Sequence, residues 1–122
     1  MPARCRWAAR AATVDWVSPT YQPTWEISAF RPLVQALVDE ASTYDGEVYL
    51  FDGDSHMYNV DHPLAAGSRW LGIHGVQSSA DNLTRITVDG EANNTNFLQV
   101  TVNRPGADHV LSWARVPYDS LR

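Results

Sequence analysis

Four consecutive apolar residues, Val48 to Phe51, most strongly constrain how this chain can fold. Neighbouring side chains of a β-strand point to opposite faces, so an unbroken apolar run requires that both faces of its sheet be covered. A polar turn at residues 45–46 separates this run from residues 28–44, where apolar residues recur at helical spacing. We therefore expect a helix packed on a sheet, with the apolar run as a buried strand.

The preceding segment, SAFRPLVQALVDEASTY, predicts the main helix. Ser28 is a candidate N-terminal cap, and Pro32 falls near the first turn, where a missing backbone N–H is tolerated. Leu33, Leu37 and Ala41 recur at intervals of four and form the stripe that we expect to face the sheet. No other part of the chain has so regular a helical pattern.

The C-terminal third shows the alternation that is typical of β-strands. The segments LTRITVD, NFLQVTVN and HVLSWARV each place alternate residues on one face: Thr84, Ile86 and Val88 in the first, Leu98, Val100 and Val102 in the second, and Leu111 and Trp113, opposite Val110, Ser112 and Ala114, in the third. Asp89-Gly90 and Pro105-Gly106 separate these segments, and the latter pair suits a type II turn. We predict three strands in an antiparallel meander and a further short strand in RWLGIHGVQ. The predicted fold class is α+β, with one main helix packed on a β-sheet and a C-terminal antiparallel meander.

Length and composition indicate one globular domain: 122 residues, 44% of them hydrophobic. Residues 1–27 show no sustained period and are expected to be an irregular segment, whereas residues 28–122 carry the patterned domain. No apolar run reaches about 18 residues, so no membrane span is expected. The nine basic residues are all arginine and are scattered, and the net charge is -5, which argues against a nucleic-acid-binding patch. A single cysteine, Cys5, cannot form an internal disulfide and fits a cytoplasmic location.

The stretch YLFDGDSHMYN places polar residues directly after the buried strand. Asp52, Asp54 and His56 stand at every second position, and in extended backbone such side chains share a face and could converge on one ion. Carboxylates and neutral imidazole suit zinc, manganese or iron. The same residues are also typical of a polar turn, in which aspartates bond to nearby backbone N–H groups. Spacing alone leaves both interpretations open.

The other three histidines are expected to be structural. His62 precedes a proline and is interpreted as a solvated loop residue. His74 lies between glycines in a predicted strand, and His109 follows an aspartate as part of an exposed turn. With Asp61, His62 could also join the cluster of Asp52, Asp54 and His56, but the solvated loop is the preferred interpretation.

Three sequence motifs are distinctive: YLFDGDSHMYN, GVQSSADNLTRITVDG and VTVNRPGADHVLSW. They lie within ISAFRPLVQALVDEASTYDGEVYLFDGDSHMYNVDHPLAAGSRWLGIHGVQSSADNLTRITVDG and its continuation FLQVTVNRPGADHVLSWARVPY. Together these segments resemble the C-terminal part of bacterial metallophosphoesterases of the calcineurin-like family. The resemblance covers residues 27–118. It implies part of a four-layer αββα sandwich with two metal ions at the carboxyl ends of its strands.

In that family the last metal motif is a Gly-His-x-His word after a strand, and the matching word here is GDSH, residues 53–56. The resemblance implies that His56 is a metal ligand and that Asp54 replaces the first histidine of the motif. The implied cofactor is a divalent ion, Mn, Fe or Zn. The implied partner is a phosphate ester, which the complete family fold hydrolyses with metal-bound hydroxide.

The family's earlier metal motifs, Asp-x-His, Gly-Asp-x-x-Asp and Gly-Asn-His-Asp/Glu, do not occur upstream of Ser28. One histidine and one or two aspartates are too few for a two-metal site, because each ion draws several protein ligands. We therefore expect an incomplete site in a fragment or degenerate member with weak activity or none by itself. The alternative is a non-catalytic β-rich interaction module, whose uncovered sheet surface would favour self-association.

Overall fold

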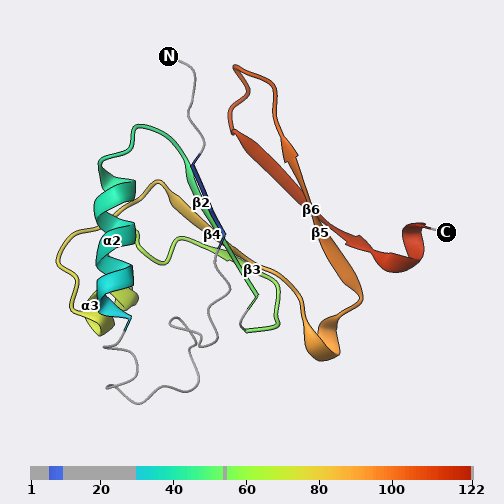
Figure 1. The fold of residues 1–122 in the computed structure, drawn as a ribbon, viewed down its shortest axis with the longest axis horizontal. Coiled ribbons are helices and arrows are strands. Elements are labelled where there is room, and N and C mark those ends of the chain that lie inside the picture. The colour runs from blue at the N-terminus through green and yellow to red at the C-terminus, as the bar shows by residue number, and fades with distance from the viewer. Residues whose placement is uncertain (1–5, 10–29, 54, 122) are drawn as a thin grey trace.

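The computed structural model describes residues 6–9, 30–53 and 55–121. It contains three layers, which are two helices, a four-stranded sheet and a β-hairpin (Figure 1). This mixed arrangement is of the α+β kind that the sequence predicted. In chain order the elements are β1 (Arg6–Ala9), α2 (Arg31–Ser42), β2 (Val48–Asp52), β3 (Asn59–Asp61), α3 (Arg69–His74), β4 (Leu83–Thr87), η1 (Glu91–Asn93), β5 (Asn96–Val102), β6 (Leu111–Pro117) and η2 (Tyr118–Leu121).

The four-stranded sheet has the order β1-β2-β4-β3 and is mainly parallel. β2 runs parallel to both β1 and β4, whereas β3 pairs antiparallel with β4. In register, Leu50 of β2 lies opposite Arg85 of β4, and Arg85 lies opposite Asp61 of β3. The carboxyl ends of β2 and β4 therefore meet at one edge of the sheet, the edge at which open α/β sheets bind ligands.

Strand β2 is covered on both faces, which confirms the expectation from its apolar run. Leu50 is 7% exposed and packs in one cluster with Val34 and Val38 of α2. Its neighbour Tyr49 is 3% exposed and packs in a second cluster with Ile86 and the hairpin. Burying an apolar side chain of this size contributes about 1.5–3 kcal/mol, so both outer layers gain stability from this one strand.

Helix α2 packs on the sheet through a stripe next to the predicted one. Val34, Val38 and Ala41 are buried, whereas Leu33 and Leu37 are only half-buried. Both sets recur at helical spacing, so periodicity could not choose between them. Three small side chains allow the helix axis to approach the sheet more closely than leucines would, and the two leucines flank this contact.

The N-terminal end of α2 has no side-chain cap. Phe30 occupies the cap position, and Pro32 lies in the first turn as the sequence predicted. The capping prediction for Ser28 falls outside the described residues. No helix within the described ranges is long and apolar enough to cross a membrane.

The predicted three-stranded meander is wrong in its first strand. β4 pairs with β2 and β3, whereas β5 and β6 form a separate two-stranded sheet. Alternating apolar residues predict that a segment is a strand, but they do not identify its partner. The chain leaves the first sheet after β4 and reaches the hairpin through η1 (Figure 1).

Three further segments differ from expectation. RWLGIHGVQ begins with helix α3, whose cap Ser68 accepts a hydrogen bond from the Trp70 N–H (3.3 Å), and Gly75 ends the helix with a φ of 66°. A serine and a glycine at these two positions favour a short helix over a strand. β1 lies in residues 1–27, which were expected to be irregular, and β3 lies in a stretch for which no strand was predicted. With four and three residues, both strands are too short to show a period.

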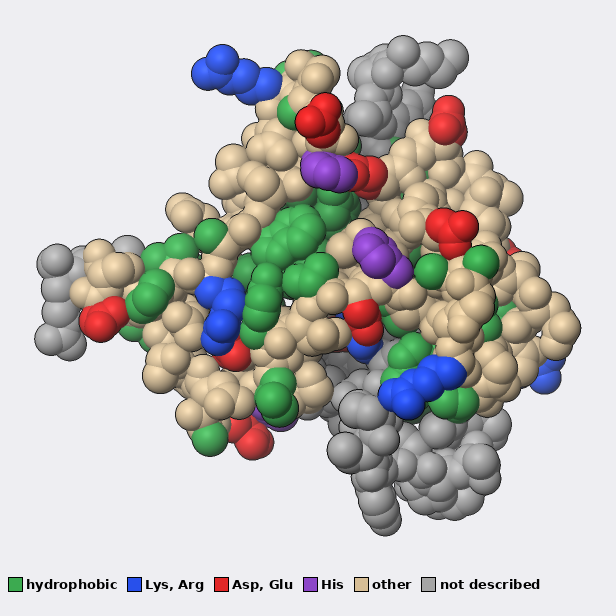
Figure 2. Space-filling model, turned by 180° about the vertical axis from the view of Figure 1, so that it is seen from behind, with side chains coloured by type: hydrophobic (Ala, Val, Ile, Leu, Met, Phe, Trp, Pro, Cys, Tyr) green, Lys and Arg blue, Asp and Glu red, His purple; other side chains and the backbone are tan. Residues whose placement is uncertain are grey.

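The hairpin is held against the sheet by aromatic contacts and an ion pair. Trp113 packs edge-on against Tyr49 with ring centroids 6.0 Å apart, and its indole N–H donates to the Tyr58 hydroxyl (3.1 Å). Arg115 donates to the Asp89 carboxylate from two nitrogens, at 2.8 and 2.7 Å. Hydrophobic side chains form a continuous area where the hairpin meets the sheet (Figure 2). This second cluster is therefore only partly covered.

Glu47 joins the turn end of the hairpin to the start of β2. Its carboxylate accepts hydrogen bonds from the Val110 N–H (2.7 Å), the Tyr49 hydroxyl (2.9 Å) and the His109 ring (2.6 Å). Burial alone would raise the pKa of Glu47, but these hydrogen bonds prevail and lower its pKa. The hydrogen bond to Glu47 and the negative charge of the Glu47 carboxylate raise the pKa of His109. The charge of Asp108 raises this pKa as well.

Asn82 closes the C-terminal end of α2 and the turn that follows. Its amide nitrogen lies 2.9 Å from the Ala41 carbonyl oxygen, 3.1 Å from that of Tyr44 and 2.7 Å from that of Gly46. Carbonyl groups at a helix C-terminus lack partners within the helix. Since Asn82 directly precedes β4, one side chain ties the end of the helix to the centre of the sheet.

We predict that Asn82→Ala lowers the free energy of unfolding by about 1–3 kcal/mol, because it removes the donor from half-buried carbonyl groups. Asn82→Asp should cost at least as much, since it turns an oxygen toward three carbonyl oxygens. Urea unfolding measures both. The exposed Asn94 is the matched control, and Asn94→Ala should change the stability by less than about 0.5 kcal/mol. Equal effects at the two positions would contradict this role of Asn82.

The Glu47–His109 pair predicts greatest stability in mildly acidic solution. His109 stabilises the folded state fully below its ordinary pKa of 6.5, and this contribution disappears as the pH rises through its raised folded-state pKa. Glu47 contributes above its ordinary pKa of 4.5 and ceases to contribute as the pH falls through its lowered folded-state pKa. Between about pH 5 and pH 8, the wild type should lose stability relative to His109→Gln, because glutamine does not titrate. A constant difference in unfolding free energy would disprove the coupling.

Candidate metal centre

Two loops meet at the carboxyl edge of the sheet, one after β2 and one after β4. The Val88 N–H donates to the Asp52 carbonyl (2.8 Å), and the Tyr58 N–H donates to the Asp89 carboxylate (3.2 Å). These bonds join the two loops because β2 and β4 are parallel neighbours that end together. Side chains from both loops are therefore brought into one small region.

His56 lies at the centre of this region, in a backbone conformation that is unusual for its type. Its φ is 57°, and its carbonyl accepts hydrogen bonds from the Gly90 N–H and the Asn93 side-chain amide, both at 3.1 Å. The edge of its ring packs on Gly90, where a Cβ atom would lie 2.8 Å from Nδ1. The loop after β4 thus holds His56 through both its backbone and its ring.

Glu91 faces His56 across the two loops. His56 Nε2 lies 3.7 Å from Glu91 Oε1, and the two side chains are 43% and 75% exposed. This distance exceeds a hydrogen bond, and it is close to the separation of about 3.4 Å between two ligands of one tetrahedral zinc ion. An imidazole nitrogen and a carboxylate oxygen suit Zn, Mn or Fe. The pair therefore offers two potential ligands to a divalent ion.

Backbone strain is concentrated at this pair. Among the described residues other than glycine, only His56 and Glu91 have a positive φ, at 57° and 47°. The left-handed conformation costs about 1–2 kcal/mol for such residues. Strain of this kind persists where neighbouring contacts enforce it, and it is frequent at functional sites.

Neither aspartate of the sequence motif is found beside His56 and Glu91 in the described part of the structure. Asp54 lies outside the described residues. Asp52 is 3.9 Å from Nη1 of the buried Arg85, which also donates to Asp61 at 2.8 and 2.6 Å. A guanidinium beside a carboxylate competes with a metal ion for its oxygens. In the described part of the chain, no three His, Cys, Asp or Glu side chains gather closely enough to hold a metal ion.

The remaining histidines lie elsewhere. The Nδ1 atom of His62, at the end of β3, is 3.2 Å from the Leu83 carbonyl oxygen, and His62 is exposed, in line with its sequence interpretation. His74 is 2% exposed at the end of α3, which corrects the prediction that it lies on a strand. His109 is exposed as predicted, and its partner is Glu47.

The sequence did not predict Glu91 as a site residue, although its carboxylate lies 3.7 Å from the His56 imidazole. The sequence prediction placed LTRITVD, residues 83–89, in a meander with the hairpin strands, and a hairpin loop after this strand would have no reason to approach His56. A prediction that β4 pairs in parallel with β2 would have identified Glu91, because the loops that follow two parallel neighbouring strands lie at the same end of the sheet.

Comparison of the chain with protein-family models, with curated proteins and with solved structures finds no match in any of the three. The resemblance to metallophosphoesterases thus stays a prediction from the sequence.

The strain at His56 predicts an unusual order of stability among its variants. His56→Gly should be more stable than His56→Ala by about 1 kcal/mol, because glycine adopts a positive φ without steric cost. The neighbouring Met57 is exposed and its φ is not positive. Met57→Gly should therefore be no more stable than Met57→Ala. Thermal and urea unfolding of the four variants measures the difference. If alanine is the better residue at both positions, the backbone of His56 is not strained.

Proposed function

We propose that this chain is an incomplete domain of the metal-dependent phosphoesterase type. In this proposal the pair of His56 and Glu91, called the His56 corner below, binds a divalent ion. Hydrolysis of phosphate esters then requires further metal ligands from outside the chain. The single observation that carries the proposal is the position of His56. It lies at the carboxyl edge of the sheet, strained and 3.7 Å from Glu91, in the word GDSH that the sequence resemblance marks as a metal motif.

The residues at the corner have separate tasks. His56 supplies a neutral imidazole nitrogen, and Glu91 supplies a carboxylate oxygen. Asp54 is a further candidate ligand on sequence grounds. Gly90 and Asn93 fix the backbone of His56 through hydrogen bonds of 3.1 Å to its carbonyl, so they orient the ring without touching the ion.

A bound divalent ion would polarise a phosphoryl oxygen and provide a nucleophile from water. Two or three ligands bind such an ion weakly, because phosphoesterase metal sites draw several protein ligands per ion. The described residues contain no other acidic or histidine side chain that completes the set. We therefore propose little or no turnover by the chain alone.

A second candidate function is a non-catalytic interaction module. β5 and β6 form a two-stranded sheet, and among the described strands neither has a partner on its outer side. Val102 at the end of β5 is 66% exposed. Unpaired strand edges with apolar side chains favour pairing with another chain or self-association. This candidate requires no metal.

Metal titration tests the first proposal. The purified protein should bind about one Zn²⁺ or Mn²⁺, and His56→Ala should weaken binding by about tenfold or more, since it removes one of few ligands. Glu91→Gln should weaken binding in the same direction. His62→Ala is the matched control, because His62 is an exposed histidine whose ring contacts the Leu83 carbonyl at the start of β4, whereas Glu91 follows the end of that strand. Isothermal titration calorimetry measures all four proteins.

Two outcomes would decide against a metal corner: no metal binding, or an equal loss in His56→Ala and His62→Ala. Assays on p-nitrophenyl phosphate and its diester then show whether turnover accompanies binding. Sedimentation velocity over a range of concentrations addresses the second candidate. Concentration-dependent association of a protein that binds no metal favours the interaction module.

A further inference from the structure

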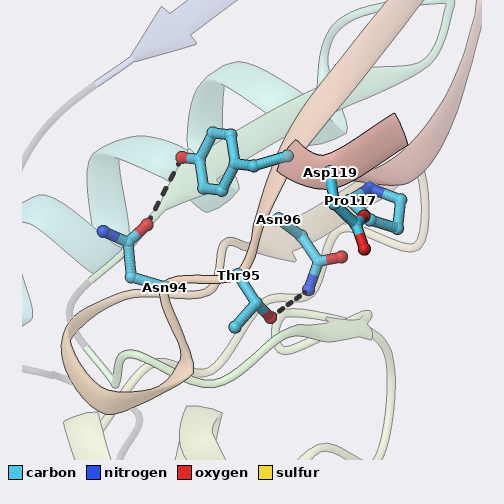
Figure 3. Close-up of a pocket in the computed structure, with 6 residues that line it drawn as sticks. Asn94, Thr95, Asn96, Pro117 and Asp119 are labelled. Carbon is cyan, nitrogen blue, oxygen red and sulfur yellow. Dashed lines mark hydrogen bonds between the residues drawn. The ribbon is translucent and has the colours of Figure 1, made fainter. Parts of the chain in front are cut away.

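A hollow of about 290 Å³ lies between the hairpin and the carboxyl edge of the sheet. The residues around it that matter here are Tyr58, Asp89, Asn96, Phe97, Arg115 and Tyr118. A second, more open hollow of about 560 Å³ is drawn in Figure 3. Asn96 and Tyr118 line both hollows. The first volume is near the lower limit of small-molecule sites, so it suits a single ring system.

Aromatic rings form much of the wall of the first hollow. The Phe97 and Tyr118 rings have centroids 5.9 Å apart and are tilted by 35°. The Arg115 guanidinium lies 4.9 Å from the centre of the Tyr58 ring. The Tyr58 ring is anchored because its hydroxyl accepts the Trp113 indole N–H at 3.1 Å. Such surfaces favour planar partners, because flat rings stack on them at little entropic cost.

The polar groups of the hollow favour an uncharged ring. Asp89 is nearly buried, with 7% of its side chain exposed, and Arg115 neutralises it. The Asn96 side-chain amide can both donate and accept hydrogen bonds, and its nitrogen contacts the Thr95 hydroxyl at 3.0 Å (Figure 3). An amide beside aromatic rings suits a heteroaromatic group that has both donors and acceptors.

Residues that line the hollow are near neighbours, along the chain, of the two residues of the His56 corner. Tyr58 follows His56 by two residues, and Asp89 directly precedes Gly90, on which the His56 ring packs. One ligand could therefore contact the hollow and the corner together. The Glu91 carboxylate would repel an anionic group at the corner unless a cation were bound there.

We infer that this hollow binds the planar aromatic group of a phosphate ester, such as a nucleotide base or an aryl group, with the phosphate directed to the His56 corner. The position of the phosphate rests on the proposed function. The aromatic site stands on the hollow alone, so the two claims can fail separately.

Adenosine tests the aromatic site without phosphate or metal. Adenosine should bind in the presence of a metal chelator, whereas ribose should not, and nuclear Overhauser contacts should connect the adenine ring to aromatic protein protons. Tyr118→Leu should weaken adenosine binding by about fivefold or more, because one stacking surface is lost. Tyr118 is 48% exposed, so this change leaves the core intact. Thr101→Ala, an exposed change on β5 away from the hollow, is the matched control.

Adenosine 5′-monophosphate and adenosine, compared with Mn²⁺ present, test the direction of the phosphate. The nucleotide should bind at least about fivefold more tightly, and His56→Ala should remove the dependence on Mn²⁺ while adenosine binding persists. Failure of adenosine to bind, absence of ring contacts, or equal binding by Tyr118→Leu and the wild type would overturn the aromatic site. Loss of metal binding with intact adenosine binding would remove only the proposed function.

Discussion

The parallel pairing of β2 with β4 stabilises both outer layers of the molecule. Leu50 and Leu83 from these strands pack with the helices, and Tyr49 and Ile86 pack with the hairpin. A two-stranded hairpin and a helix of 12 residues are each marginal in water. Both become stable here because the paired strands offer an apolar surface to each of them.

The same pairing assembles the candidate metal centre. Parallel neighbours end at a common edge, so the loop that contains His56 lies against the loop that contains Glu91. Hydrogen bonds from Gly90 and Asn93 to the His56 carbonyl enforce the left-handed backbone conformation. The strain is thus a consequence of contacts between loops and not of either loop by itself. It leaves the imidazole and the carboxylate facing each other on an exposed part of the surface, where an ion from solution can reach them.

Local patterns predicted the elements better than their arrangement. The main helix, the buried strand, the two strands of the hairpin and the type II turn were predictable. The turn is confirmed by a φ of 89° at Gly106 and the Ala107 N–H bond to the Arg104 carbonyl. The partner of β4 was not predictable, because alternation is the same in every kind of sheet. Helix α3 was missed because its six residues are defined by caps and not by a period.

An apolar run and a polar segment are local properties, so the amino-acid sequence is enough to predict that the strand after the main helix is buried on both faces and that His56 follows it. Which strand pairs with β2, and therefore which side chain faces His56, depends on how the layers pack. Glu91 lies 35 positions further along the chain, and no local pattern links residues so far apart. Their proximity follows from the parallel register, which is set by the packing of two layers on opposite faces of one sheet.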